Sequence, residues 1–270
     1  DFFKIEFPFY VKWYLKFWQA RQLFDPKVPH LTYINSWGFA ESLQEPLLIA
    51  SIKSTDDEKT TFSKLDAVAR FIETFTVRRS VNNKKFGQTA IKYTMFNIIK
   101  LIRNNDIEQL RSNLIVEINE LPQKWDAILT FRLHGMNRKF VKHLLSRISS
   151  YLDQLVGKDS TYGFYHHPKG KQFEIEHIWA DKFEEHTDEF QQITDFQIWR
   201  NSIGALLLLP QGTNQSFNSD RYSDKLDHYL KENTYAQTLH PNYYQKNPNF
   251  LKSNVIQNLG FRAHIEFRKN

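Results

Sequence analysis

The stretch Phe173-Glu-Ile-Glu-His-Ile-Trp-Ala-Asp-Lys182 sets an acid directly before a histidine inside an apolar, alternating run. The alternation places Phe173, Ile175 and His177 on one face and Glu174, Glu176 and Ile178 on the other. A period of two residues predicts a β-strand whose successive side chains point to opposite faces. Glu176-His177 is therefore either a half-buried strand edge or part of a catalytic site.

A second strand, a loop and a helix are predicted downstream of this stretch. An acidic segment of helical composition comes first, followed by the strand-like run Gly204-Ala-Leu-Leu-Leu-Leu-Pro210. A loop at 211–216 and a polar helical segment at 219–232 complete the unit. If the strands pair and the helix packs across them, the end of the first strand and the loop face a common cleft. That cleft would contain Glu176, His177, Asn201 and Asn214.

The chain upstream of residue 157 has the period of α-helices. Apolar residues recur three or four positions apart, and no segment carries a run of catalytic residue types, so we interpret these helices as scaffold. The four clearest apolar faces are Leu65, Val68, Ala69, Ile72 and Phe75; Ile91, Met95, Ile98, Ile99 and Ile102; Ile107, Leu110, Leu114 and Ile118; and Phe140, Val141, Leu144, Leu145, Ile148, Leu152 and Leu155.

A change of composition at 156–172, with three glycines and a proline, predicts a domain boundary. We expect a helical domain at residues 1–157 and a second domain at residues 158–270. The predicted fold class is α+β and predominantly α-helical.

The composition excludes several classes of protein. Contents of 41% hydrophobic and 15% aromatic residues are typical of a packed globular chain. The absence of cysteine excludes disulfides and thiolate zinc sites, and it is compatible with a cytoplasmic location, which we expect. No apolar run approaches the ~18 residues of a membrane span, so we expect no membrane partner. A net charge of +6 is compatible with binding to nucleic acid.

The residue types of the expected cleft suit phosphodiester hydrolysis. A neutral histidine can take a proton from water near pH 7, because its ordinary pKa is about 6.5. A carboxylate and an amide carbonyl are oxygen ligands of the kind that Mg²⁺ prefers. Glu176 and His177 are adjacent on a strand, however, so they need a twist or bulge to serve one site, unless they act from two sides of the phosphate.

Several motifs together resemble a known family. They are I-E-H-I-W-A at 175–180, R-N-S-I-G-A-L-L-L-L-P-Q-G-T-N-Q-S-F at 200–217, D-K-L-x-x-Y at 224–229, F-T-V-R-R at 75–79 and F-R-L-H-G-M-N at 131–137. The chain resembles the nuclease half of the GmrSD-type restriction endonucleases, which carry a C-terminal His-Asn-His (HNH, ββα-metal) domain. One departure is Ala180, which stands where many relatives have proline.

The resemblance implies a role for each motif residue. His177 would be the general base, and Asn201 would support the active-site loop or orient that base. Glu176 and Asn214 would hold Mg²⁺ or Mn²⁺. Contacts with the DNA are implied for Lys225, Tyr229 and Arg200.

The function implied by the resemblance is that of a metal-dependent DNA endonuclease in a phage-defence, modification-dependent restriction system. Its partners would be double-stranded DNA, modified or unmodified, and an N-terminal sensor domain, whose Asp-Gly-Gln-Gln-Arg motif does not occur in this sequence. We therefore expect the chain to be the C-terminal part of a longer protein.

Two alternatives remain open at the level of sequence. The chain could be a helical DNA-binding or partner-docking module whose HNH unit is inactive. It could also be a zinc hydrolase that uses His166, His167 and His177 as ligands. We expect the two further acid–histidine pairs, at His186 and His228, to be surface residues.

Overall fold

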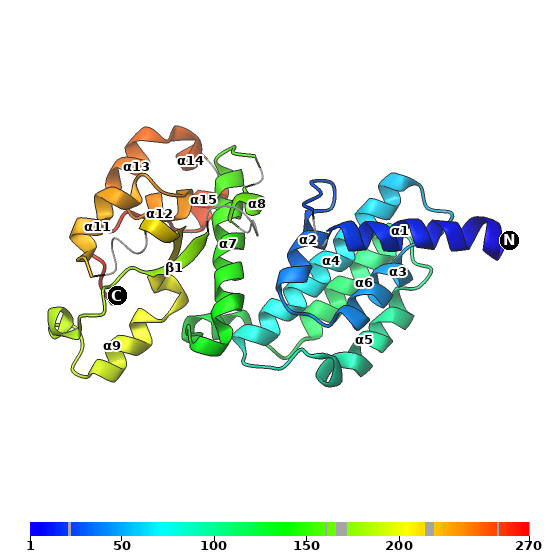
Figure 1. The fold of residues 1–270 in the computed structure, drawn as a ribbon, viewed down its shortest axis with the longest axis horizontal. Coiled ribbons are helices and arrows are strands. Elements are labelled where there is room, and N and C mark those ends of the chain that lie inside the picture. Colours follow the sequence, from blue (N-terminus) through cyan, green and yellow to red (C-terminus); the bar gives the residue numbers. More distant parts are fainter. Residues whose placement is uncertain (21–22, 160, 166–171, 214–218, 253, 270) are drawn as a thin grey trace. The chain divides into compact units, whose positions relative to one another are not determined.

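The structure, a computed structural model, describes residues 1–20, 23–159, 161–165, 172–213, 219–252 and 254–269. It is mostly helical, with one two-stranded sheet in these residues (Figure 1). This agrees with the predicted class, a predominantly helical α+β fold. None of the described helices is long and apolar enough to span a membrane.

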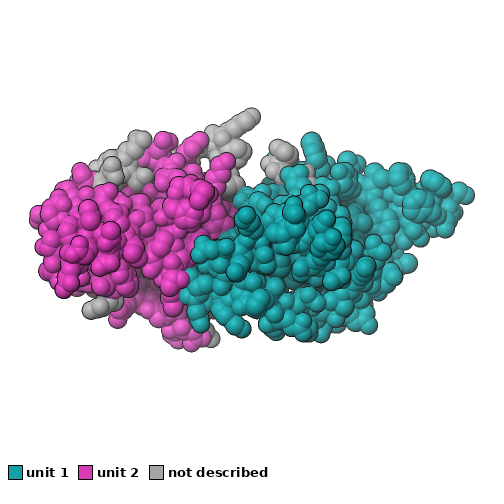
Figure 2. Space-filling model, turned by 90° about the horizontal axis from the view of Figure 1, so that it is seen from below, with its two compact units in different colours: residues 1–128 teal, residues 129–270 magenta. Residues whose placement is uncertain are grey.

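The chain forms two compact units, residues 1–128 and 129–270, which Figure 2 colours separately. The predicted boundary lies later, between residues 157 and 158. The segment 129–157, assigned from its helical pattern to the first domain, therefore lies in the second unit. Compact units describe packing rather than independent folding, so the domain division stays a prediction.

The first unit is a helical bundle around one apolar core. Its predicted faces on α4, α5 and α6 point inward, and Leu65, Ile72, Met95 and Leu110 are fully buried. α4 contacts α2, α3 and α6, while α5 contacts α3 and α6. The elements are a π-helix at Phe2–Glu6, α1 (Phe7–Ala20), α2 (Pro29–Ser36), α3 (Glu41–Ser51), α4 (Glu58–Val81), α5 (Gln88–Ile102), α6 (Ile107–Glu120) and a 3₁₀ helix at Trp125–Thr130, within which the unit ends.

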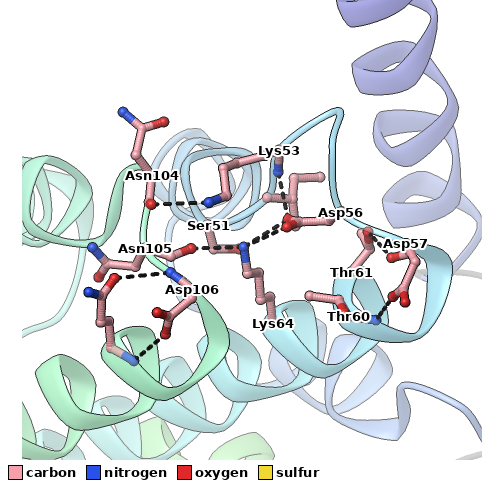
Figure 3. A network of polar contacts seen from close by, with 12 residues as sticks. Ser51, Lys53, Asp56, Asp57, Thr60, Thr61, Lys64, Asn104, Asn105 and Asp106 are labelled. Atoms are coloured by element: carbon pink, nitrogen blue, oxygen red, sulfur yellow. Dashed lines mark hydrogen bonds and ion pairs between the residues drawn. The ribbon is translucent and has the colours of Figure 1, made fainter.

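A buried lysine joins two loops of this bundle. The Lys64 ammonium donates to both carboxylate oxygens of Asp56, at 3.0 and 2.8 Å, and to the Asn105 carbonyl at 2.8 Å (Figure 3). The Lys64 side chain is completely buried and that of Asp56 nearly so. A buried charge needs such partners, so this contact ties the loop before α4 to the loop before α6.

The second unit contains a small sheet surrounded by helices. Its longest helix is α7 (Arg138–Leu155), which contacts β2, α8 and α12. The remaining elements are α8 (Tyr162–Tyr165), β1 (Phe173–His177), α9 (Ile193–Arg200), β2 (Leu206–Pro210), α11 (Tyr222–Tyr229), α12 (Thr234–Gln237), α13 (Pro241–Lys246), α14 (Pro248–Lys252), α15 (Asn254–Asn258) and 3₁₀ helices at Gly135–Asn137, Phe183–His186 and Ile203–Ala205.

The two strands pair in antiparallel fashion, with His177 opposite Leu206 and Glu176 opposite Leu207. Every residue of β2 is buried, which explains its unbroken run of leucines. Leu207 and Leu209 pack with Tyr229 of α11 and Ala236 of α12. The sheet therefore holds α11 and α12 on the side toward which Glu176 points.

Candidate active site

His177 ends strand β1 and contacts the asparagine that ends helix α9. Its Nε2 lies 3.0 Å from Oδ1 of Asn201, and the imidazole is half-buried. Asn201 is in turn fixed by its surroundings. Its Nδ2 donates to the Gln197 carbonyl at 2.8 Å, and its own carbonyl accepts from the Leu133 N–H at 2.8 Å. The predicted convergence of His177 and Asn201 is thus present.

These contacts determine which nitrogen of His177 carries the proton. A backbone carbonyl only accepts hydrogen bonds, so the Asn201 atom that faces Gln197 is the amide nitrogen and the atom that faces His177 is the oxygen. Nε2 of His177 must then donate. In the neutral ring this leaves the lone pair on Nδ1, which is the atom able to accept a proton.

The surroundings of His177 favour its neutral form. Burial and, to a smaller extent, the positive charges of Arg200 and Arg138 together lower the pKa of His177 to about 4, against the opposing effect of the hydrogen bond to Asn201. The imidazole is therefore uncharged near neutral pH, as a general base must be.

Glu176 points away from His177, into the interior beneath α11. Its Oε1 accepts from the Lys225 ammonium at 2.7 Å and from the Tyr229 hydroxyl at 3.2 Å. Glu176 is 3% exposed, Lys225 1% and Tyr229 0%. Burial raises the pKa of Glu176, and the Lys225 ammonium opposes that shift. The motifs predict that Glu176, Lys225 and Tyr229 belong to one site, and the structure brings them together. Their arrangement is not the one expected of a metal ligand and two DNA contacts.

The residues expected to contact DNA lie inside the unit. Arg200 is 9% exposed, and its Nε donates to the Trp179 carbonyl at 3.1 Å. Lys225 and Tyr229 are more deeply buried still. A phosphate could reach these three side chains only if they left their present positions.

Other predicted residues are placed elsewhere or lie outside the described residues. Asn214, the predicted second metal ligand, lies outside the described residues. So do His166 and His167, two of the three predicted ligands of the zinc alternative. In the described part of the chain, no three histidine, aspartate or glutamate side chains group closely enough to hold a metal ion. His228 is exposed, as predicted. His186 is partly buried, with 18% of its side chain exposed, and its ring stacks on Phe196, so the predicted surface position holds only in part for His186.

The structure adds residues to the site that the motifs did not indicate. Arg138, at the start of α7, is half exposed and pairs with Glu174 of β1 at 3.1 Å. Lys142, one turn later, lies 3.6 Å from the same carboxylate. Arg132 forms an isolated β-bridge with Ser202, next to Asn201. The F-R-L-H-G-M-N motif at 131–137 is the one sequence signal that could have pointed to this segment. Even this motif does not show that the segment contacts residues 174–202.

Comparison with known proteins identifies one family. The model of the GmrSD restriction endonucleases, C-terminal domain, matches residues 77–264, which is well over half of the chain. Neither the curated proteins nor the solved structures contain a match to this sequence. The matched range includes both strands, Asn201 and helices α7 and α11.

Proposed function

Because this chain belongs to the family of GmrSD restriction endonuclease C-terminal domains, we propose that it is an HNH-type endonuclease that hydrolyses DNA phosphodiester bonds. Its setting would be a phage-defence, modification-dependent restriction system in the cytoplasm, in which a sensor domain N-terminal to this part recognises the modified DNA.

The observation that carries this proposal is the contact between His177 and Asn201. The asparagine holds Nε2 of the imidazole at 3.0 Å and leaves Nδ1 as the basic atom of a neutral ring. In the proposed reaction Nδ1 takes a proton from water as the water oxygen attacks phosphorus. The bond between phosphorus and the sugar oxygen breaks, and that oxygen leaves with the bonding electrons and takes up a proton from solvent. Arg138 is half exposed, and its positive charge is one of those that lower the pKa of His177. We propose that it helps to hold the phosphate.

Glu176 and Asn214 are the residues that we propose to hold Mg²⁺ or Mn²⁺. The donor chemistry fits, because carboxylate and amide oxygens are hard ligands. Lys225 and Tyr229 both bind Oε1 of Glu176, and neither binds Oε2. A bound divalent ion would supply positive charge that stabilises the charge developing on the phosphate oxygens.

Plasmid cleavage tests the proposal. We expect the chain to nick or cut supercoiled plasmid in Mg²⁺ or Mn²⁺, and a chelator to stop the reaction. His177→Ala should lower the rate by at least about a hundredfold, since it removes the general base. Intact plasmid under every metal condition, with the protein folded, would overturn the proposal.

The burial of Glu176 favours a second candidate function. A carboxylate bound to an internal lysine is also what an inactive DNA-binding module would show, because its charge is already compensated. Such a module would bind plasmid with an affinity that falls with salt, and would leave the plasmid uncut.

A further inference from the structure

Lys225 and Tyr229 form, with Glu176, a buried cluster that lies between α11 and the end of β1. The two residues are four positions apart on α11, so they lie on one face of the helix. Lys225 is 1% exposed and Tyr229 0%, which removes both from the surface that DNA would touch. The polar atoms of both side chains meet the same carboxylate oxygen, Oε1 of Glu176.

The Lys225 ammonium also links Glu176 to the histidine that comes after it in the chain. Its Nζ lies 2.7 Å from Oε1 of Glu176 and donates to the main-chain carbonyl of His177 at 3.1 Å. One cation thus fixes a side chain and a peptide group at consecutive positions of β1. Because successive strand side chains point to opposite faces, fixing this peptide also fixes the face of the strand on which the His177 side chain lies.

We propose that Lys225 and Tyr229 are positioning residues, which hold Glu176 and His177 in place from inside the molecule and do not contact DNA. The inference rests on the proposed nuclease function, because it assigns to these residues the orientation of the proposed base and metal ligand. Hydrogen bonds to a ligating carboxylate orient it toward its ion, and their loss typically weakens metal binding by tenfold to a hundredfold.

The test compares two tyrosines of α11. Tyr229→Phe keeps the ring but removes the hydroxyl bond to Glu176, whereas Tyr222→Phe removes a hydroxyl that donates to the His264 carbonyl. We expect Tyr229→Phe to weaken Mn²⁺ binding, measured by titration calorimetry on the whole chain, by about tenfold. Its kcat for plasmid cleavage should fall similarly, while KM for DNA stays within about twofold. Tyr222→Phe should leave all three quantities unchanged.

Lys225→Met separates positioning from DNA contact. If Lys225 bound a phosphate, its loss would reduce the slope of log affinity against log salt by about one, measured with a duplex of about 20 base pairs in chelator. We expect an unchanged salt slope, because the buried ammonium binds Glu176 and the His177 carbonyl. If the unpaired Glu176 prevents folding of this variant, the comparison of Tyr229→Phe with Tyr222→Phe decides alone.

The results separate this inference from the proposed function. A reduced salt slope in Lys225→Met, or wild-type Mn²⁺ binding in Tyr229→Phe, overturns the positioning role even if the wild type cuts DNA. An uncut plasmid with wild-type protein overturns the proposed function, whereas Mn²⁺ binding and the salt slope still decide whether the two side chains hold Glu176.

Discussion

Asn201 connects the end of helix α9 to the candidate base. Asn201→Ala removes the acceptor that holds Nε2 of His177, so the imidazole can rotate and Nδ1 is no longer the fixed basic atom. We expect kcat for plasmid cleavage to fall by about tenfold to a hundredfold with little change in KM. The loss of the bond to Gln197 should also cost about 1 kcal/mol of stability in a urea denaturation experiment.

Asn82 offers a matched control for this substitution. Like Asn201, it ends a helix and donates from Nδ2 to the carbonyl four residues earlier, in this case Arg78 at 2.8 Å. Asn82→Ala should therefore lower stability by a similar amount and leave kcat unchanged. Equal losses of kcat in both variants would mean that Asn201 acts only through stability.

Asp153 is a second residue whose role is specific enough to predict. It is 1% exposed, and its carboxylate accepts from Lys158 at 2.9 Å, Thr161 at 2.8 Å and Tyr165 at 2.6 Å, and also from Thr234. Burial tends to raise the pKa of Asp153, but these hydrogen bonds outweigh it and lower the pKa below the ordinary 3.8. The carboxylate thus joins α7 to the segments around α8 and α12.

The pH dependence of Asp153 is a consequence of this shift. Because its pKa is lower in the folded than in the unfolded state, its contribution to stability is present above pH 3.8 and is lost as pH falls through the folded pKa. Asp153→Asn should cost about 3 kcal/mol at pH 7, and this difference should shrink below about pH 4. Urea denaturation at a series of pH values measures it, with exposed Asp159→Asn as the control that changes little.

At the scale of residues, the alternation of β1 could be read from the sequence and the partners of its side chains could not. The period of two places Glu176 and His177 on opposite faces, and the structure agrees. Nothing in the sequence shows that the partner of Glu176 lies 49 positions away, at Lys225. That contact depends on how α11 packs on the sheet, which the sequence does not show. From the sequence alone, Glu176 and Lys225 therefore resemble surface residues of a nuclease motif.

The buried Lys64 of the first unit can be substituted to measure how much its contacts with two loops contribute to the free energy of unfolding. Lys64→Met leaves Asp56 without its cation and the Asn105 carbonyl without its donor (Figure 3). Removing one partner of a buried ion pair is strongly destabilising, and we expect a loss of about 3 kcal/mol by urea denaturation. Lys100→Met, at an exposed position of α5, should change stability by less than about 0.5 kcal/mol. A small loss in Lys64→Met would show that water reaches Asp56 readily.

Elements with strong periodicity were predicted well and short irregular ones were not. The predicted apolar faces of α4 and α5 are buried throughout, because repeated apolar residues at helical spacing leave few other arrangements. The segment between the strands was expected to be helical, but it contains a 3₁₀ helix at Phe183–His186 and only an eight-residue α9. Packing of Trp179, Phe190 and Phe196 organises this segment, and such a cluster of rings has no periodic signal in the sequence.

For the molecule as a whole, composition located a polar, glycine-containing segment but not the limit of the compact units. The segment 156–172 differs in composition because it lies between α7 and β1. α7 nevertheless packs with helices C-terminal to that segment, since Leu152 lies in a cluster with Tyr243, Phe250 and Ile256. An amphipathic pattern predicts that a helix packs against another part of the chain. It does not predict whether that part precedes or follows the neighbouring loop in the sequence.

Fragments of the chain distinguish a domain boundary at residue 128 from one at residue 157. A polypeptide of residues 129–270 retains α7, the Asp153 hydrogen bonds and the contact of Leu133 with Asn201. It should unfold cooperatively in urea. A fragment of residues 158–270 lacks α7, so β2 and α12 lose the helix that contacts them and Thr234 loses its buried acceptor. We expect it to show little cooperative unfolding, because the apolar core that remains would be too small to offset the conformational entropy lost on folding.

An intermediate fragment makes this comparison sharper. Residues 138–270 keep all of α7 but lose the Leu133 and Arg132 contacts beside Asn201. This fragment should fold with a urea midpoint below that of 129–270, because it lacks the main-chain contacts beside Asn201 and the buried side chains of Phe131 and Leu133. If 158–270 instead unfolded as cooperatively as 129–270, the boundary predicted from composition would be the folding boundary, and α7 would be an addition to a nuclease unit that folds without it.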